Sequence, residues 1–225
     1  ALIRTLVDED SVFELKAEYG PGIVTALVRI EGRPMGLIAN NPMHLGGAVD
    51  APGADKASRF MRLCNDFGLP LLSLCDTPGF MVGPQAEQDG QVRYSAQMFL
   101  AAAKLHVPVF TIVLRKGYGL GAQSMAAGSF HAPLFIVSWP TGEFGGMGIE
   151  GAVRLGYRRE LEAIEDPQAR ERFFDERVAH LYDVGKAVNM EAAMEIDAVI
   201  DPAETRTWIR HGLQAAAMRD AAPPR

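Results

Sequence analysis

Three times along the chain, an apolar run ends at a glycine turn and a helical pattern follows. The turns are at Gly79, at Gly119 with Gly121, and at Gly145-Gly146. A buried strand, a turn and a helix in alternation are typical of α/β folds. Because the carboxyl ends of parallel strands lie at one edge of a sheet, this alternation predicts that the three turns line one site.

Hydrophobic periodicity and turn residues divide the rest of the chain into expected elements. A hairpin is expected around Glu31-Gly32-Arg33, and Gly68 is expected to end a helix as its C′ residue. The expected strands are 23–30, 34–39, 69–75, 107–114, 133–139 and 196–200, and the expected helices are 54–67, 88–106, 120–128, 149–164, 167–184 and 205–218. Residues 1–18 have a helical or irregular pattern, and 140–148 form a third turn.

The composition favours a globular protein and argues against two classes of function. Of the 225 residues, 48% are hydrophobic, which is ample for the core of one large domain or two small ones. The formal net charge is −6 and no cluster of Lys and Arg stands out, so no nucleic-acid partner is expected. No stretch has the length of a membrane span, and the N-terminus lacks the pattern of a signal peptide. A cytoplasmic protein without a membrane partner is therefore expected.

The two cysteines, Cys64 and Cys75, are expected to be buried free thiols. This usage fits a reducing compartment, and it offers no Cys-x-x-Cys site for a metal or for redox chemistry. The first residue is Ala1 rather than methionine, so we expect the chain to be a fragment of a longer protein.

The turn at Gly119-Leu120-Gly121 is the best candidate for a ligand site. Its glycines let backbone N–H groups approach a ligand closely, at the start of a helix. Two kinds of anion suit such a turn: a bound phosphate, or an oxyanion that exists only during a reaction. A tight strand-to-helix connection that binds nothing is the third alternative.

Side chains with conventional catalytic chemistry are scarce around these turns. The five histidines are scattered and none has the i, i+4 spacing of a metal pair, so no metal site is expected. Asp76 is expected to cap its own turn rather than to act as a base. Ser124 follows the central turn but has no positioned base, and Glu87 with Arg93 is expected to fix the loop 80–86. The scarcity points to oxyanion stabilisation by backbone donors.

Several longer motifs occur in the order and near the spacing of one known family. They are Val7-Asp8-Glu9 with Phe13-Glu14, Gly36 to Pro42, Lys56 to Cys64, Pro70, Asp76 with Pro78-Gly79-Phe80, Glu87-x-x-Gly90-x-x-Arg93, Arg115-Lys116-x-Tyr118-Gly119, Trp139-Pro140-Thr141-x-Glu143, Met147-Gly148 with Gly151-Ala152-Val153, and Asp197 to Thr205. On these motifs, the chain resembles the C-terminal half of the carboxyltransferase (β-type) component of biotin-dependent acyl-CoA carboxylases, the propionyl-CoA and acetyl-CoA carboxylase family.

The resemblance implies a crotonase-like α/β fold, a spiral of strands and helices, in which 1–225 is one C-terminal-type domain of a two-half enzyme. It implies carboxybiotin on a carrier protein as cofactor and an acyl-CoA as substrate. The backbone N–H groups of Leu120 and Gly121 would hold the ureido oxygen of biotin. The other biotin-binding residues that it implies are Gly79, Phe80, Tyr118, Gly119, Gln123, Gly146, Met147 and Gly148.

The implied partners are an N-terminal carboxyltransferase half or subunit, a biotin carboxylase or biotin carrier subunit, and further copies in a homo-oligomer. Two positions depart from the family: Leu120 lies in a run that is commonly Gly-Gly-Ala, and Gln123 stands where aspartate is frequent. Three other functions stay open on the sequence: a biotin-dependent decarboxylase subunit, a crotonase-like serine hydrolase that uses Ser124, and a nonenzymatic interaction module.

Overall fold

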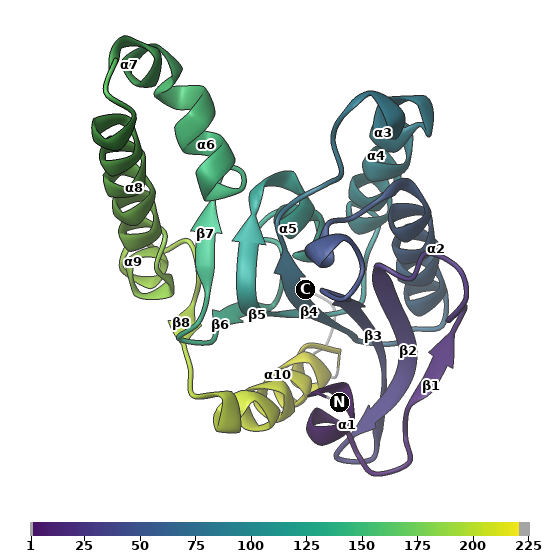
Figure 1. Cartoon of the computed structure of the whole chain (residues 1–225). Helices are drawn as coiled ribbons and strands as arrows, with labels where there is room; N and C mark the ends of the chain where they lie inside the picture. The colour runs from purple at the N-terminus through teal and green to yellow at the C-terminus, as the bar shows by residue number, and fades with distance from the viewer. Residues whose placement is uncertain (1, 221–225) are drawn as a thin grey trace.

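The computed structural model describes residues 2–220, and one mixed sheet organises them (Figure 1). The sheet has eight strands in the order β1-β2-β3-β4-β5-β6-β8, with β7 paired to β5. The first three strands are antiparallel, and the pairs from β3 to β8 are parallel. The strands are β1 (Phe13–Leu15), β2 (Ile23–Ile30), β3 (Arg33–Asn40), β4 (Leu71–Thr77), β5 (Val109–Tyr118), β6 (Phe135–Ser138), β7 (Glu143–Gly145) and β8 (Ala198–Val199).

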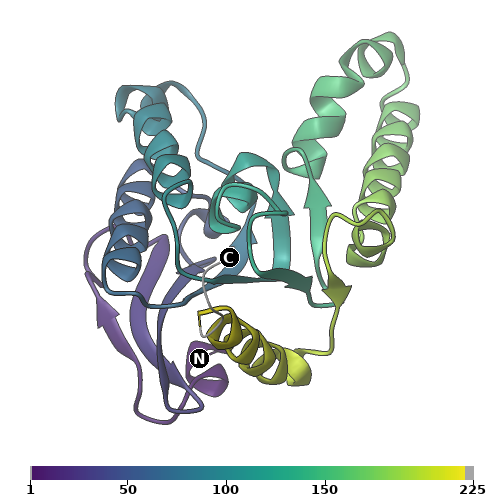
Figure 2. The ribbon, with the colours of Figure 1, turned by 180° about the vertical axis from the view of Figure 1, so that it is seen from behind.

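Helices cover both faces of this sheet, as the views from the front and from behind show (Figure 1, Figure 2). They are α1 (Leu2–Leu6), α2 (Ala51–Asp66), α3 (Pro84–Gln88), α4 (Gln91–Ala102), α5 (Gly119–Met125), α6 (Ile149–Gly156), α7 (Arg158–Ala163), α8 (Pro167–Val184), α9 (Ala187–Ala192) and α10 (Thr205–Asp220), with 3-10 turns η1 (Leu45–Gly47) and η2 (Pro202–Glu204). One core lies between the sheet and α2, α4 and α5. A second core lies between the opposite face and α1 with α10.

The expectation of strands buried on both faces is confirmed, and β4 illustrates the reason. Every residue of β4 is buried. Leu71 packs in the core under α2, while its neighbour Leu72 packs in the core under α10, because successive side chains of a strand point to opposite faces. A continuous apolar run is therefore the sequence pattern of such a strand.

Two expected turns are also confirmed. Residues 23–30 pair antiparallel with 33–40, and Glu31 and Gly32 between them have φ of 54° and 74°, the left-handed pair that a two-residue hairpin turn requires. Gly68 follows the end of α2 with φ of 65°, as expected of a C′ glycine.

Several expected elements differ from the structure. The helix expected over 88–106 is shorter in the structure: α4 begins at Gln91, after Gly90 with φ of 78°, and ends at Ala102. Helix α3 lies mostly in the segment that was expected to be a loop. Strand β5 continues through Arg115 and Lys116 to Tyr118, so these residues are not part of the turn. The expected turn over 140–148 contains β7, the helix over 149–164 breaks at Tyr157, and α9 was not predicted.

Helices α6, α7 and α8 form an arm that projects from the body of the domain (Figure 1). All residues of α7 and α8 are described, and none of them is buried. Cations on aromatic rings hold the arm together: the guanidinium carbon of Arg154 lies 4.7 Å from the ring centroid of Phe174, and that of Arg177 lies 5.1 Å from the ring centroid of Phe173. The arm therefore relies on few apolar contacts with the rest of the chain.

Lys56 is a lysine buried in the interior, and we expect its replacement by an apolar residue to stabilise the fold. The residue is 1% exposed in α2, and among the described residues its Nζ has no hydrogen-bond partner. Burial lowers the pKa of Lys56, the charge of Glu14 raises it, and that of Lys16 lowers it further. We expect Lys56→Met to raise the free energy of unfolding at pH 7 by about 1–3 kcal/mol, because a buried polar group without a partner is lost.

The pH dependence supplies the control for this prediction. A lysine whose pKa is lower in the folded state destabilises the fold below that pKa, and the penalty disappears as pH rises toward the unfolded value of about 10.4. Urea unfolding between pH 7 and 10 is therefore expected to show a wild-type stability that rises relative to that of Lys56→Met. A methionine variant of equal or lower stability at pH 7 would contradict the prediction.

Candidate functional site

The three glycine turns lie against one another at the carboxyl edge of the parallel strands. A Cβ atom on Gly121 would lie 2.6 Å from the carbonyl carbon of Gly79 and 2.9 Å from the backbone nitrogen of Phe80. A Cβ atom on Gly119 would lie 2.6 Å from the carbonyl oxygen of Gly146. The convergence predicted from the sequence is therefore present. We call the backbone of Gly119–Gly121, with the facing turns at Gly79 and Gly146, the cradle.

The first turn of α5 supplies the backbone donors of the cradle. Gly119 begins the helix with φ of 58°, and Leu120 and Gly121 follow in its first turn. N–H groups in the first turn of a helix have no acceptor within the helix, and no side chain of the described residues caps α5. The partial positive charge of the helix N-terminus adds to these donors. The side chain of Leu120 is 61% exposed.

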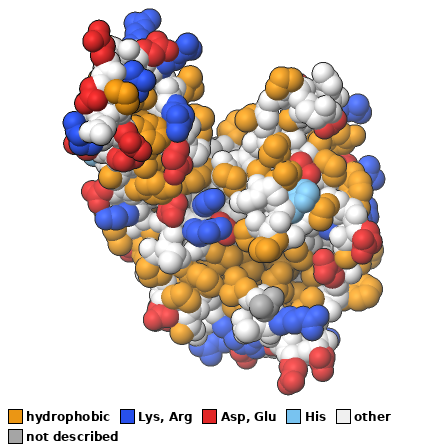
Figure 3. Space-filling model, in the orientation of Figure 1, with side chains coloured by type: hydrophobic (Ala, Val, Ile, Leu, Met, Phe, Trp, Pro, Cys, Tyr) orange, Lys and Arg blue, Asp and Glu red, His pale blue; other side chains and the backbone are white. Residues whose placement is uncertain are grey.

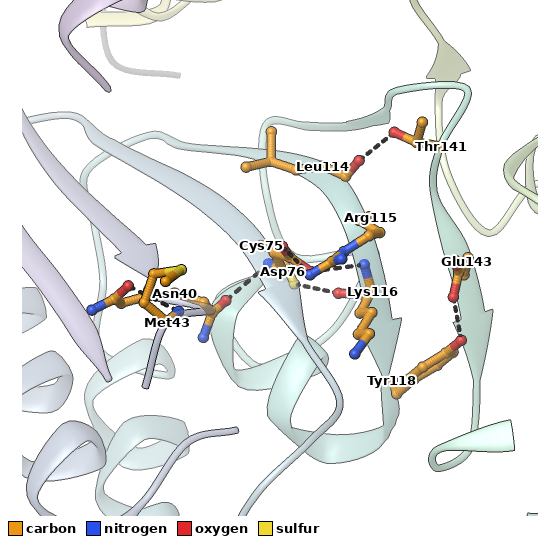
Figure 4. Close-up of polar contacts among 11 residues, drawn as sticks. Asn40, Met43, Cys75, Asp76, Leu114, Arg115, Lys116, Tyr118, Thr141 and Glu143 are labelled. Carbon is orange, nitrogen blue, oxygen red and sulfur yellow. Dashed lines mark hydrogen bonds and ion pairs between the residues drawn. The ribbon is translucent and has the colours of Figure 1, made fainter. Parts of the chain in front are cut away.

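Tyr118 fixes the strand end that precedes the cradle. Its hydroxyl donates a 2.7 Å hydrogen bond to Glu143, and the two side chains point toward each other (Figure 4). Burial and the carboxylate of Glu143 raise the pKa of Tyr118 above its ordinary value. Tyr118 is 2% exposed, and it also pairs with Gly145 across β5 and β7. Its phenol therefore holds β7 against the end of β5, beside the cradle. Neither Tyr118 nor Glu143 was expected in this role, and spacing along the chain gives no signal for the pair.

Asp76 does not cap its own turn, contrary to the expectation. Its carboxylate accepts hydrogen bonds from Nε and a terminal nitrogen of Arg115 at 3.3 and 3.2 Å, and from the backbone N–H of Lys116 at 3.2 Å (Figure 4). The hydroxyl of Thr77 caps the turn instead, since it accepts from the N–H of Gly79 at 3.1 Å. Asp76 thus ties the end of β4 to an irregular stretch of β5, where the register shifts.

Ser124 is placed where it cannot act as a nucleophile. It is 0% exposed, and its hydroxyl donates a 2.7 Å hydrogen bond to the carbonyl oxygen of Gly121. The charged partners of the histidines are elsewhere: His44 pairs with Asp50 at 3.2 Å and His131 with Glu195 at 3.7 Å. The structure contradicts the serine hydrolase alternative. Within 2–220, no group of three or more His, Cys, Asp or Glu residues is arranged to hold a metal ion.

The remaining candidates surround the cradle in different ways. Phe80 packs against Phe99, with ring centroids 6.4 Å apart, and the carbonyl oxygen of Gln123 accepts from the N–H of Gly128 at 2.8 Å. Met147 is 43% exposed, and a Cβ on Gly146 or Gly148 would meet no atom within 4 Å. This side of the cradle is therefore open.

The loop 80–86 is anchored by a residue that the sequence did not single out. Glu87 and Arg93, which were expected to fix this loop, are exposed. Gln91, between them, is buried, and its amide donates to the carbonyl of Val49 at 3.0 Å. Val49 in turn pairs with Phe80 in an isolated bridge. An unusually buried glutamine near a helix start has no distinctive pattern in the sequence.

The surface around the cradle is concave. Figure 3 shows this face hollowed between the arm and the mass formed by α3 and α4, with Lys and Arg side chains at the base of the hollow. No helix within residues 2–220 combines the length and the apolar character that crossing a membrane requires.

Comparisons with known proteins agree on one family. The family model described as the carboxyl transferase domain matches residues 1–225. The methylmalonyl-CoA carboxyltransferase 12S subunit of Propionibacterium freudenreichii subsp. shermanii is 36% identical over 224 residues, which are 99% of this chain and 42% of that protein. The chain thus spans less than half the length of this curated relative.

Two solved structures are similar over nearly the whole chain. A single-chain, multi-domain long-chain acyl-CoA carboxylase is 58% identical, with a TM-score of 0.85, over 93% of this chain and 20% of that one. The transcarboxylase 12S subunit, described as a hexamer with methylmalonyl-CoA bound, is 35% identical, with a TM-score of 0.87, over 100% of this chain and 42% of that one.

Proposed function

The chain belongs to the carboxyl transferase domain family, and we propose that it is the biotin-side half of an enzyme that transfers the carboxyl group of carboxybiotin to an acyl-CoA. The family membership expected from the motifs and the crotonase-like α/β fold are both confirmed. One observation carries the proposal of function: three glycine turns converge on a helix start whose backbone donors have no partner within the helix.

The backbone of the cradle fits the group that biotin would present. The N–H groups of Leu120 and Gly121 would hold its ureido oxygen, which gains negative charge when the carboxyl group leaves. Biotin itself would supply the carboxyl group and a ring nitrogen that accepts a proton. Glycine at 121 is required because a Cβ atom there would lie 2.6 Å from the carbonyl carbon of Gly79. Gly79 with Phe80 would form one wall, and Gly146, Met147 and Gly148 the opposite one.

Side chains would contribute positioning rather than proton transfer. The buried hydrogen bond between Tyr118 and Glu143 would hold the strand end from which the donors project. Gln123 lies on α5, two positions after Gly121, and would adjoin the bound biotin. A mechanism based on backbone donors needs no nucleophile, in agreement with the complete burial of Ser124.

The substrate we propose is an acyl-CoA with a long acyl chain. The 58% identity with a long-chain acyl-CoA carboxylase supports this choice over the shorter substrates of relatives near 36% identity. The departure at Leu120 is in keeping with it, because a 61% exposed leucine adds apolar surface beside the cradle.

We propose 1–225 as one C-terminal-type domain whose companion is an N-terminal carboxyltransferase half. The chain matches 42% of the length of the methylmalonyl-CoA carboxyltransferase 12S subunit, which supports a companion half. The hexameric assembly of the transcarboxylase 12S structure supports a homo-oligomer. A biotin carboxylase or biotin carrier subunit would deliver the carboxyl group. We propose the cytoplasm as the compartment, because Cys64 and Cys75 are buried free thiols.

Reconstitution tests this function. The chain would be assayed alone and together with a companion N-terminal half, with carboxybiotin as donor and acetyl-, propionyl- or palmitoyl-CoA as acceptor. We expect the pair to transfer the carboxyl group at least about a hundredfold faster than either part, because each half holds one reactant. A correctly assembled pair without activity on any of the three acyl-CoAs would refute the proposed function.

A further inference from the structure

A second concave site lies beside the cradle, between η1 with the start of α2 on one side and the loop into α3 on the other. We call it the α3 groove. Its volume is about 370 Å³, within the range of small-molecule sites. Its apolar lining residues include Leu45, Pro52, Met81, Val82, Pro84 and Ala86.

One short segment separates the α3 groove from the cradle. Gly79 and Phe80 face Gly121 across the cradle, and Met81 and Val82, the next two residues, line the groove. Val49 holds this segment through two backbone hydrogen bonds: its N–H donates to the carbonyl of Gly79 and its carbonyl accepts from the N–H of Met81, both at 2.9 Å. A molecule whose reacting end lay at the cradle would thus have the groove as the adjoining space.

The polar side chains that line the α3 groove are already hydrogen bonded within the chain. The two carboxylate oxygens of Asp50 contact the N–H of Gly53 at 2.9 Å and the ring of His44 at 3.2 Å. Gln85 donates to Asp89 at 3.0 Å. Gln91 donates to the carbonyl of Val49 at 3.0 Å and to Ser95 at 2.9 Å.

The charge of the lining narrows the class of ligand. Among residues 2–220, its charged lining residues are Asp50 and Asp89, and neither Lys nor Arg lines it. Two carboxylates and no cation disfavour a phosphate or a nucleotide, because like charges repel. Since the lining polar groups are satisfied, an uncharged apolar ligand loses nothing by lacking hydrogen-bonding groups.

Two apolar residues of the α3 groove are exposed to solvent, and one of them has a strained backbone conformation. Val82 is 82% exposed and Leu45 is 49% exposed. Leu45 also has φ of 49°, a left-handed conformation that a bulky side chain rarely adopts. Strain of this kind persists where the surrounding structure imposes it, and it is concentrated at functional sites.

We propose that the α3 groove receives the acyl chain of a long-chain acyl-CoA. The α carbon of that acyl group, which accepts the carboxyl group, would then lie at the cradle. This inference rests on the proposed function, which supplies an acyl-CoA at the cradle. At roughly 30 Å³ for each water-sized group, the groove holds about twelve such groups. That is far more than the acyl part of acetyl-CoA or propionyl-CoA needs, so the groove would select for chain length.

Leu45→Asp tests the proposal in the carboxylase that contains this chain, with palmitoyl-CoA and propionyl-CoA as alternative acceptors. Aspartate tolerates positive φ better than leucine, so the fold is expected to survive. We expect KM for palmitoyl-CoA to rise about tenfold, the effect of losing contact with about two methylene groups, while KM for propionyl-CoA changes less than twofold. Leu100→Asp is the matched control, because Leu100 is 54% exposed on α4 and lies outside the groove. It is expected to leave both constants unchanged.

If Leu45→Asp changed KM equally for both substrates, or for neither, the assignment of the groove to the acyl chain would be overturned. The proposed function would still stand. Calorimetric binding of palmitoyl-CoA separates the remaining cases. If the wild-type protein carboxylates no acyl-CoA but binds palmitoyl-CoA in a Leu45-dependent way, the function fails and the groove is supported. If it neither reacts with nor binds palmitoyl-CoA, both proposals fail.

Discussion

Gly121→Val is expected to lower carboxyl transfer at least about a hundredfold and to abolish detectable binding of free biotin. A Cβ atom at this position would lie 2.6 Å from the carbonyl carbon of Gly79 and 2.7 Å from its Cα. Backbone atoms cannot rotate away as a side chain can, so the turn at Gly79 must shift or the helix start must move outward. Either movement displaces donors that must lie within hydrogen-bond distance of a developing charge, and the loss of one such donor costs about 10²–10³ in rate.

Gly156→Val is the matched control, since a Cβ at Gly156 would meet no atom within 4 Å. This residue ends α6, away from the cradle, and its substitution is expected to leave biotin binding unchanged. Biotin binding would be measured by calorimetry on variants whose circular dichroism and thermal unfolding match those of the wild type. If Gly121→Val is folded and binds biotin with wild-type affinity, the assignment of the cradle is wrong.

Asp76→Ala is expected to destabilise the chain by about 2 kcal/mol and to lower the melting temperature by roughly 4–8 °C. The carboxylate lies 3.2 Å from the backbone nitrogen of Lys116 and accepts two bonds from Arg115, so its loss leaves an N–H without an acceptor. The larger part of the effect is expected from that N–H, because the side chain of Arg115 is 47% exposed and water can replace its partner. Urea unfolding would give the change in free energy.

A surface ion pair provides the comparison for Asp76. Glu162 pairs with Arg158 at 2.8 Å in the arm, and the two side chains are 64% and 72% exposed. Glu162→Ala is expected to change the free energy of unfolding by less than about 0.5 kcal/mol. Comparable effects of the two substitutions would show that the Asp76 contact is no stronger than an ordinary surface pair. Because Asp76 also holds the end of β5 before the cradle, we expect its variant to lose transfer activity in addition to stability.

Local patterns in the sequence were sufficient wherever one physical property dominated. The hairpin 23–40, the buried strand β4 and the C′ glycine Gly68 were predicted from alternation, apolar continuity and the positive φ that glycine permits. The convergence of the three turns was predicted because parallel strands place their carboxyl ends at one edge. The family followed from motifs spread over nearly the whole chain and was confirmed.

Contacts between distant residues were beyond such patterns. Asp76 was expected to cap a turn, but its partners Arg115 and Lys116 lie 39 and 40 positions further along the chain. The start of α4 was expected at Gln88 but lies at Gln91. A single glycine is tolerated within a helix, so Gly90 did not mark the boundary in the sequence, and its left-handed φ decided it in the structure. The short strand β7 was hidden in a glycine-rich turn because three residues carry too little periodicity to be recognised.

The sequence by itself determined the α/β alternation, the family and the turn at Gly119-Leu120-Gly121, because these depend on residue types along a continuous stretch. Only the tertiary structure decided that a Cβ on Gly121 would meet the backbone of Gly79, that Tyr118 is tied to Glu143, and that an apolar groove adjoins the cradle. These features arise from the packing of strands and turns that are remote in sequence. Their distances are set by how the sheet brings its strand ends together, which no local pattern encodes.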